Sequence, residues 1–280
     1  MNHWTPKLVA LDADGTIVGA DDEVPYPIVD KLRQIDSRGI PIVLVTGRAW
    51  LSAKIVLDQL GLPRMYCVCN NGATVVTYPP LEVVRAETFD PEPIVEAIRD
   101  QPSVIMAVED FGRGYRTSRP FPPGIYDLHG ELTVVPWEDL AKGPVSRVII
   151  RDPAASAQEF DALVSRLDLH GLYWSKSADN WIDIGPGGAG KAKGLAYVAG
   201  LLGIRREDVL AMGDSYNDVD LLSWAGRGVA LGDAPPELTR VADFVTARFD
   251  QNGTLAELDR WFPGREGGEL QIDHDNCLRD

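Results

Sequence analysis

The sequence predicts a Rossmann-like, doubly wound α/β core of parallel strands with an inserted α+β domain. Three observations lead to this prediction. Apolar runs rich in Val and Ile alternate with helical patterns over the first 80 residues, the order expected of a parallel sheet. The same alternation resumes near residue 185. Between these parts the apolar runs are shorter and more alternating, which is typical of an α+β unit.

The first element is the apolar run at residues 8–11, whose composition is that of a buried strand. A helix is expected over residues 27–38, because its apolar residues share one face and Gly39 ends the pattern. The elements expected next are a strand within 40–48, a helix over 50–60 and a strand within 65–73.

The C-terminal part repeats this order. It is expected to contain helices over 194–202 and 217–225, and strands within 208–215, 227–233 and 242–247. In the middle of the chain, strands are expected within 82–89, 103–110, 130–136, 146–152, 172–177 and 180–185, and helices over 91–99 and 154–167. Two helices with several short strands are what an inserted α+β domain requires.

These patterns divide the chain into a discontinuous core, residues 1–80 and 185–263, and an inserted domain, residues 81–184. Linkers are expected at 78–80, which prolines stiffen, and at 185–188, which glycines loosen. The inserted domain would then act as a lid on the core. The tail at 264–280 is polar and lacks periodicity, so we expect it to be poorly ordered.

Composition excludes several classes of partner. The 280 residues carry 27 basic and 42 acidic side chains, a formal net charge of -15, which argues against nucleic acid and anionic membrane surfaces. The three cysteines form neither a disulfide framework nor a zinc pattern. A signal peptide and a membrane-spanning run are not expected, so a cytoplasmic protein is the default prediction. No feature of the sequence sets an oligomeric state.

Three predicted strands end in polar residues that could carry chemistry. The letters are DADGT at 12–16, TGR at 46–48 and GDSYND at 213–218. Because ligands bind beyond the carboxyl ends of parallel strands, these residues are expected to converge on one crevice. Several carboxylates gathered there would repel one another without a cation. Magnesium prefers oxygen ligands and commonly pairs with phosphate, so the pattern predicts phosphoryl transfer at a magnesium site.

Taken together, DADGT, VTGR, a lysine before a helix and GDSYND resemble the haloacid dehalogenase superfamily. The insertion and the closing GVALGDAPPELTRVADFVT resemble its Cof-type sugar-phosphatase branch. The resemblance runs in order from Lys7 to Trp261. It implies a Rossmann-like core, a mobile α/β cap, and hydrolysis of a small phosphorylated metabolite through an aspartyl-phosphate.

By matching position, the resemblance implies that Asp12 is the nucleophile. Asp14 would protonate the leaving oxygen and later activate water. Asp12, Asp14 and Asp214 would bind Mg²⁺, Asp14 through its backbone carbonyl. The hydroxyl of Thr46 would bind a phosphoryl oxygen. The alternative for Asp12 and Asp14, two aspartates in a solvated turn, is disfavoured by the ordered set of motifs.

The catalytic lysine has two candidates in GGAGKAKG. Lys193 precedes a glycine, as the family pattern favours, but the spacing to the flanking segments favours Lys191. We prefer Lys191, since a shift of two residues turns a helical side chain by about 200°. Asn217 and Asp218 would hold metal-bound water or the lysine.

Substrate contacts are expected from the core and from the insertion. Gly47 would let the backbone approach the phosphate, and Asn71 would line the leaving-group pocket. Arg48 is a candidate phosphate clamp, although an arginine that opens a helix is commonly solvated. In the insertion, Arg113 and Arg116 could receive an anionic substrate. A solvated hairpin tip is the open alternative for both.

The motifs fit more than one activity. The first is a magnesium-dependent phosphatase acting on a small organic phosphate, most simply a sugar phosphate. The second is a phosphomutase or phosphotransferase on the same core, in which another hydroxyl accepts the phosphoryl group. The third is a catalytically silent binding module, against which the complete set of motif residues argues.

Overall fold

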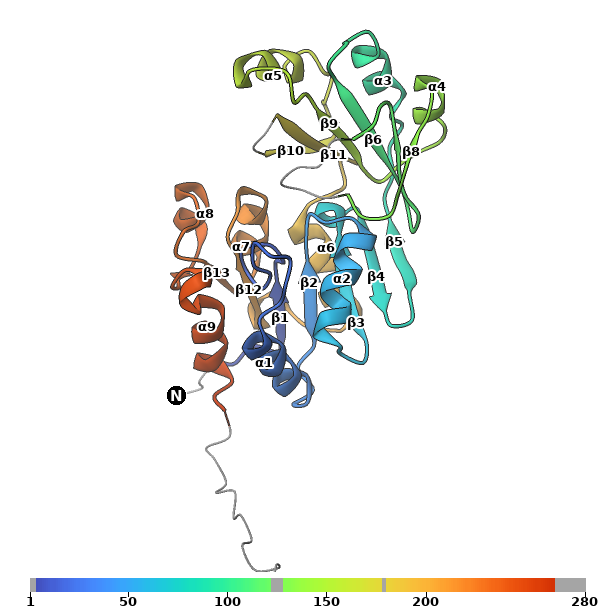
Figure 1. Cartoon of the computed structure of the whole chain (residues 1–280). Helices are drawn as coiled ribbons and strands as arrows, with labels where there is room; N and C mark the ends of the chain where they lie inside the picture. Colours follow the sequence, from blue (N-terminus) through green and yellow to red (C-terminus); the bar gives the residue numbers. More distant parts are fainter. Residues whose placement is uncertain (1–3, 122–127, 178–179, 265–280) are drawn as a thin grey trace, which may run out of the picture.

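The computed structural model describes residues 4–121, 128–177 and 180–264. It contains two sheets, each in its own unit, with the smaller unit above the larger one in Figure 1. We call residues 89–185 the upper unit and the remainder of the described chain the lower unit. The chain enters and leaves the upper unit once, so the lower unit is discontinuous in sequence.

The sheet of the lower unit has eight strands. Their order is β14 (Phe244–Val245), β13 (Arg227–Ala230), β12 (Val209–Gly213), β1 (Leu8–Leu11), β2 (Ile42–Val45), β3 (Met65–Cys69), β4 (Thr74–Tyr78) and β5 (Glu82–Ala86). The pairs from β14 to β3 are parallel, and β4 and β5 continue the sheet antiparallel. The prediction of a parallel α/β core is confirmed.

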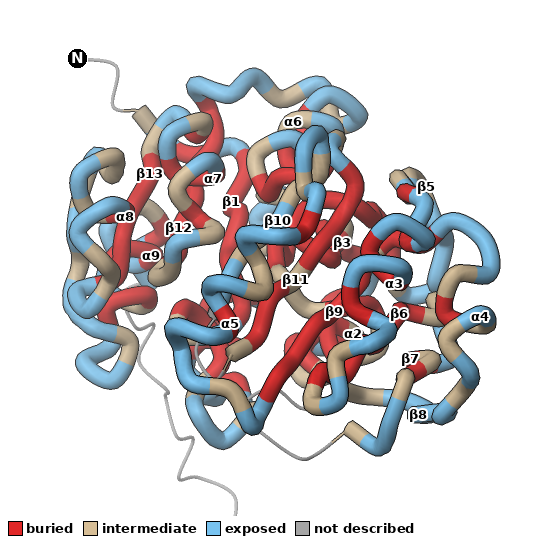
Figure 2. The backbone as a smooth tube through the Cα atoms, turned by 90° about the horizontal axis from the view of Figure 1, so that it is seen from above, coloured by how far each residue is buried: buried red, intermediate tan, exposed pale blue. Residues whose placement is uncertain are grey.

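Helices cover both faces of this sheet, as the alternation of buried residues along its strands requires. On β1, Val9 and Leu11 pack toward one set of helices, and Leu8 and Ala10 toward the other. The first set is α1 (Tyr26–Asp36), α2 (Trp50–Leu60) and α9 (Gly253–Trp261). The second set is α6 (Lys191–Leu201), α7 (Val219–Trp224) and α8 (Pro236–Val241). Figure 2 shows the strands between them as buried.

The upper unit has a six-stranded sheet. Its order is β10 (Tyr173–Ser177), β11 (Trp181–Gly185), β9 (Val148–Arg151), β6 (Ile105–Asp110), β7 (Gly114–Thr117) and β8 (Glu131–Val134). One face packs against α3 (Glu92–Ile98), α4 (Trp137–Leu140) and α5 (Ala157–Val164). The other face turns toward the lower unit, where Ala49 packs with Tyr115 and Trp181. Short 3₁₀ turns occur at Asn70–Gly72, Arg206–Asp208, Tyr216–Asp218 and Phe249–Gln251.

The expected start of the inserted domain is wrong. The strand predicted within 82–89 is β5, which pairs with β4 in the lower sheet. Of the expected linker 78–80, Tyr78 ends β4 and the two prolines lie in the turn between β4 and β5. The sequence pattern misleads here because β5 is an edge strand, and edge strands are short and polar like those of an inserted unit. The chain passes to the upper unit only after Ala86.

Helix α6 begins at Lys191, three residues earlier than predicted. Gly194, where the helix was expected to begin, lies inside it and packs against β3. A Cβ at Gly194 would lie 2.4 Å from Cγ1 of Val68, so this glycine permits close packing and does not mark a loop. The first turn of the helix therefore contains both candidate lysines.

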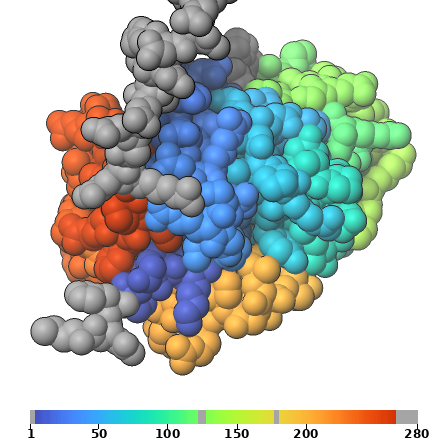
Figure 3. All heavy atoms as spheres, turned by 90° about the horizontal axis from the view of Figure 1, so that it is seen from below, coloured from blue at the N-terminus to red at the C-terminus, as the bar shows by residue number. Residues whose placement is uncertain are grey.

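The two ends of the described chain lie side by side in the lower unit. Figure 3 shows blue N-terminal and red C-terminal segments in contact on the face seen from below. Lys31 of α1 forms an ion pair with Asp259 of α9, and the rings of Trp4 and Trp261 meet edge to face at 4.8 Å. The predicted tail at 264–280 lies, apart from Gly264, outside the described residues. Among the helices that are described, none is both long and apolar enough to cross a bilayer.

Candidate active site

The side chains of the candidate site come from the carboxyl ends of adjacent strands. Strand β1 pairs with β12 on one side and with β2 on the other. Asp12 directly follows β1, Asp214 follows β12, and Thr46 follows β2. Because the three strands are parallel, these residues emerge at one edge of the sheet, on the side that faces the upper unit (Figure 1).

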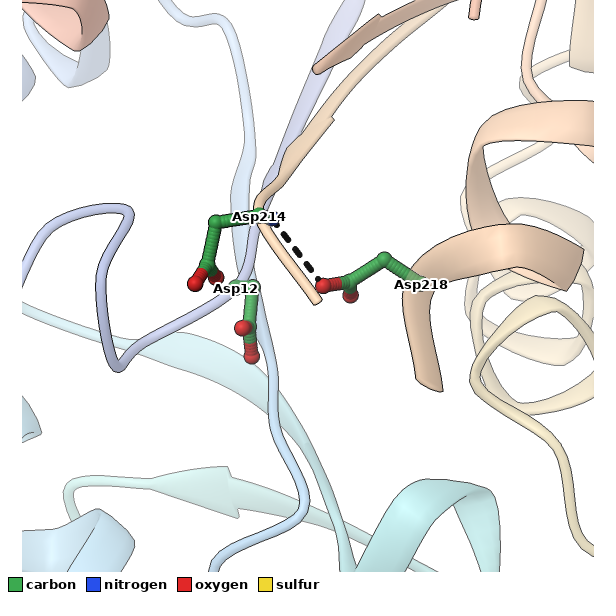
Figure 4. A group of neighbouring side chains, drawn as sticks. All are labelled: Asp12, Asp214 and Asp218. Atoms are coloured by element: carbon green, nitrogen blue, oxygen red, sulfur yellow. Dashed lines mark hydrogen bonds between the residues drawn. The ribbon is translucent and has the colours of Figure 1, made fainter. Parts of the chain in front are cut away.

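Three carboxylates form the centre of the site. Oxygens of Asp12, Asp214 and Asp218 lie within 4.8 Å of one another, and Figure 4 shows the three side chains around one point. Asp218 is fixed from the next turn of chain, where its Oδ2 accepts hydrogen bonds from the backbone N–H groups of Asp214 and Ser215 at 3.2 and 3.1 Å. Asp12 and Asp218 are buried, and Asp214 is partly exposed.

Lys191 is the cation of this cluster. Its Nζ lies 2.7 Å from Oδ1 of Asp12 and 2.7 Å from Oδ1 of Asp218, and the side chain is fully buried. Burial lowers the pKa of Lys191, but the two carboxylates outweigh burial and raise that pKa above its ordinary value. Lys193 is exposed, and its Nζ instead contacts the carbonyl of Gly187 at 3.2 Å. The structure thus brings Lys191 to the site and leaves Lys193 outside it.

The cluster has more negative charge than Lys191 can balance. Burial, reinforced by Asp218, raises the pKa of Asp12 well above its usual range. Burial and Asp218 likewise raise the pKa of Asp214 to about 7. Both shifts mean that the ionised carboxylates are unfavourable together without a further cation.

The surrounding groups fit a hard divalent ion. The atoms of this cluster that could coordinate a metal ion are carboxylate oxygens, and Mg²⁺ prefers oxygen ligands. Within the described residues, Oδ1 of Asn217 is buried and has no hydrogen-bond partner, so it is available to a bound water or ligand. Gly15 has φ +70°, and a Cβ there would lie 2.3 Å from Oδ2 of Asp214. The turn after Asp14 can therefore approach Asp214 only because this residue is glycine.

The Thr46–Gly47 turn forms the opposite wall. Thr46 is fully buried, and its Oγ1 accepts a hydrogen bond from the N–H of Arg48 at 3.0 Å, so its own proton remains available. The side chains of Asn71 and Asn217 are joined at 3.0 Å. A Cβ at Gly47 would lie only 3.1–3.2 Å from these two amides. The absence of a side chain at Gly47 keeps this wall accessible.

Asp14 does not join the carboxylate cluster through its side chain. Its two oxygens accept hydrogen bonds from Nε and Nη2 of Arg48, at 2.9 and 2.5 Å, and Arg48 also contacts Asp22. Arg48 is therefore not a solvated side chain in this arrangement, because Asp14 and Asp22 engage its Nε and Nη2 and compensate its charge. The structure gives it the position of a holder for Asp14.

The arginines predicted in the insertion are not brought to the site. Arg116 donates to the carbonyl of Asp139 in α4, on the sheet face that points away from the lower unit. The strand alternation explains this placement, because Tyr115 occupies the opposite face. Arg113 is exposed in the turn before β7. A substrate contact by Arg116 would need it to leave its partner, so that prediction is not supported.

Sequence reasoning missed a partly buried ion pair that does face the lower unit. The guanidinium of Arg147 lies 2.6 Å from Oδ1 of Asp183 and 3.2 Å from the hydroxyl of Tyr115. A small cavity between the units is lined by this pair and by polar groups of both units: Asn70, Asn71, Ser146 and Tyr173. The available signal was charge inside apolar strands, at Arg147 in SRVIIRD and at Asp183 in NWIDIG.

The raised pKa of Asp214 leads to a stability prediction for the metal-free protein. A folded pKa of about 7 exceeds the unfolded value, so the folded state binds more protons between about pH 4 and 7, and stability from this group falls as pH rises through that window. With chelator present at about pH 8, Asp214→Asn is expected to melt about 2–4 °C above wild type. Near pH 4 the difference should vanish. Thermal unfolding at both pH values tests this, and a clearly less stable variant would make Asp214 a structural anchor through Thr16.

Comparison with known proteins identifies relatives of the whole described fold. Residues 9–258 match the haloacid dehalogenase-like hydrolase family. The phosphoglycolate phosphatase of Methanopyrus kandleri is 29% identical, over 85% of this chain and 90% of its own. The 5-amino-6-(5-phospho-D-ribitylamino)uracil phosphatase YwtE of Bacillus subtilis is 25% identical, over 92% of this chain and 99% of its own.

A solved structure agrees with these sequence matches. A phosphatase of the haloalkanoate (HAD) enzyme superfamily from Bacteroides thetaiotaomicron superposes with a TM-score of 0.77 and is 25% identical. The superposition covers 92% of this chain and 96% of that protein. Both units of the fold therefore have a counterpart in one solved relative, and the resemblance seen in the motifs is confirmed.

Proposed function

The chain belongs to the haloacid dehalogenase-like hydrolases, and on this basis we propose that it is a magnesium-dependent phosphatase of a small sugar phosphate. The reaction would proceed through an aspartyl-phosphate at Asp12. The observation that carries the proposal is the position of the Asp12 carboxylate. It lies at the end of β1, 2.7 Å from the buried Lys191 ammonium and beside Asp214, in a site with unbalanced negative charge.

Each residue has a role that its contacts support. Asp12 attacks phosphorus, and Lys191, held by Asp218, orients the carboxylate and balances charge on the phosphoryl group. Thr46 uses its remaining hydroxyl proton to bind a phosphoryl oxygen. Asp14, which Arg48 holds two residues after the nucleophile, protonates the leaving oxygen and then takes a proton from the attacking water.

Mg²⁺ would be held by the carboxylates of Asp12 and Asp214 and by the backbone carbonyl of Asp14. The ion supplies charge neutralisation at the phosphoryl oxygens. Asn217, with its unpartnered buried oxygen, and Asp218 support the ligands from behind.

The upper unit is proposed to be the cap that selects the leaving group. The cavity below it is lined by amides and by the Arg147–Asp183 pair, whose charges compensate each other. Such a surface offers hydrogen-bond donors and acceptors for hydroxyl groups but no uncompensated cation for a second anionic group. Oδ1 of Asn70 is also buried without a partner among the described residues. A neutral, hydroxyl-rich leaving group fits this chemistry.

The two relatives above are named for substrates that differ in the charge of the leaving group. Glycolate carries a carboxylate, which would need a free cation in the cavity, whereas a ribityl chain presents only hydroxyl groups. We therefore propose that the leaving group of the substrate is a neutral polyol or sugar and not a carboxylate. The phosphorylated group itself enters the site of Asp12 in both cases.

The test is phosphate release from p-nitrophenyl phosphate and from a panel of phosphorylated metabolites, each with and without Mg²⁺. We expect turnover only with the metal, and a preference for sugar and polyol monophosphates over phosphoglycolate and bisphosphates. If no ester is hydrolysed, the phosphatase is excluded and a catalytically silent binding module is the remaining hypothesis. Transfer of phosphate to an added sugar in place of water would indicate a phosphomutase or phosphotransferase.

A further inference from the structure

Helix α2 starts without a capping side chain of its own. Its N-cap residue is Ala49, whose side chain cannot accept a hydrogen bond from the first turn, so backbone N–H groups there need other partners. A negative charge near this helix start comes from the upper unit, because the carboxylate of Glu109 on β6 lies close enough to the N–H of Trp50 for that group to lower the pKa of Glu109. A second contact is made nearby, where Oγ of Ser52 lies 3.0 Å from Nδ1 of His129.

The same carboxylate binds two further groups. Oε2 of Glu109 accepts hydrogen bonds from Nδ2 of Asn70 at 2.6 Å and from Oγ of Ser146 at 2.7 Å. Glu109 is 6% exposed, and burial raises the pKa of its carboxyl group. A buried carboxylate in an interface is costly unless it is hydrogen-bonded, and here its partners lie on both sides of that interface.

The two lower-unit partners of Glu109 bracket the phosphoryl-binding turn. Trp50 follows directly after residues 46–49. On the other side, the N–H of Asn70 binds the carbonyl of Arg48 at 2.9 Å, and the N–H of Asn71 binds the carbonyl of Thr46 at 3.1 Å. Glu109 is thus tied through Asn70 to the turn that presents Thr46 and Gly47, and its carboxylate lies near the start of helix α2 that follows this turn.

We propose that Glu109 is a positioning residue that couples docking of the upper unit to the shape of the turn at residues 46–49. When the upper unit docks, the carboxylate of Glu109 fixes the Asn70 amide, and the backbone bonds of Asn70 and Asn71 hold the turn ready for a phosphoryl group. This role differs from leaving-group selection and rests on the proposed phosphatase function. Its consequence is that losing Glu109 should affect every phosphate ester to the same degree.

The bridging geometry makes a distinctive prediction for two conservative variants. Glu109→Gln keeps the reach to the Trp50 N–H, and its amide can donate to Ser146 and to Oδ1 of a rotated Asn70, which has no partner now. Glu109→Asp keeps the charge but is too short to bridge. We expect Gln to stay within about threefold of wild type in kcat/KM. Asp and Ala are expected to lose about 10- to 100-fold, because a misplaced binding group costs about that much.

The measurements are kcat/KM for p-nitrophenyl phosphate and for two metabolite esters, and the inhibition constant of inorganic phosphate. In Glu109→Ala, kcat/KM is expected to fall by the same factor for all esters, and phosphate inhibition to weaken in parallel. Asn70→Gly, which tolerates the positive φ at this position, should reproduce the loss from the other side of the contact. The double variant should be no worse than Glu109→Ala, since one bridge is removed twice.

Asp152→Ala is the matched control. Asp152 is also a buried carboxylate of the upper unit, but it bonds to Ser103 and to local N–H groups, far from the turn at 46–49. It should lower thermal stability and leave phosphate inhibition unchanged. Three results would each overturn the proposal. The first is equal phosphate inhibition in Glu109→Ala and wild type, and the second is a change in kcat/KM for only some of the esters. The third is higher activity in Glu109→Asp than in Glu109→Gln.

Hydrogen exchange separates failure of this proposal from failure of the proposed function. Amides of residues 47–50 should exchange faster in Glu109→Ala than in wild type or Asp152→Ala, whether or not any ester is hydrolysed. Unchanged exchange in that segment would reject the coupling even in an active phosphatase. Absence of turnover in wild type would reject the phosphatase but leave the exchange result standing.

Discussion

Asp12→Asn is expected to lower kcat by about 10⁴-fold or more while leaving the protein folded. The amide has nearly the size of the carboxylate but lacks the anionic oxygen that attacks phosphorus, and losing a nucleophile is among the largest single effects in enzymes. The fold should tolerate the change, because the variant removes one of three mutually repelling carboxylates while Lys191 keeps Asp218 as partner. Steady-state kinetics with p-nitrophenyl phosphate and Mg²⁺ measure the effect.

The control for this variant is Asp30→Asn, an exposed aspartate on α1 whose neighbour is Gln34. It should match wild type in rate and in melting temperature. Binding of inorganic phosphate to Asp12→Asn should persist, since Thr46 and Lys191 remain. Turnover above about 1% of wild type would exclude Asp12 as the nucleophile, because no substitute carboxylate reaches the same point without rearrangement.

Much of the lower unit could be predicted because its central strands are continuous apolar runs in the sequence. A strand buried between two helical layers must be apolar along its whole length, and the runs at β1, β2 and β12 satisfy this condition. The parallel order then forces the ends of these strands together. Asp12, Thr46 and Asp214 could therefore be assigned to one crevice before any geometry was available.

The elements that were mispredicted lack such a signal. Edge strand β5 is exposed on one side and resembles the strands of an insertion, so its pairing with β4 could not be read from composition. Helix α6 contains Gly194 for close packing against Val68, a requirement set by the neighbouring strand and invisible in the helix itself. Strand β4 and helices α8 and α9 were not predicted, because their short or weakly periodic segments are specified mainly by tertiary packing.

The partners of charged side chains were the least predictable part of the site. Arg48 was a candidate for binding phosphate, but it binds Asp14 and Asp22 instead. Asp22 lies in a loop far from Arg48 in the sequence, so the pairing depends on the fold. Glu109 binds Asn70, which only docking of the upper unit brings near, and Arg147 binds Asp183 and Tyr115, which come from other strands of the upper sheet. Charge type is visible in a sequence, but the choice of partner depends on which surfaces meet.

Lys191→Met is expected to lower kcat/KM by about 10²- to 10³-fold, comparable to removing a key electrostatic group from an active site. Methionine fills most of the space of the lysine stem, so the loss reports the ammonium group. The variant should also lose stability, since Asp12 and Asp218 would remain buried without their cation, and breaking such a pair costs about 3–5 kcal/mol. Kinetics at saturating Mg²⁺ and thermal unfolding without the ion measure the two effects.

Lys193→Met is the matched control, two residues along the same helix. Its ammonium group is exposed and contacts only the Gly187 carbonyl, so rate and stability should stay within about twofold and about 1 °C of wild type. Added Mg²⁺ should recover part of the stability of Lys191→Met, because the ion also neutralises Asp12, but not its rate. A larger rate loss in Lys193→Met than in Lys191→Met would mean that the helix turns its other lysine inward during catalysis. The ion pairs of Lys191 would then be structural, and the buried cation would have to be assigned to the fold and not to the reaction.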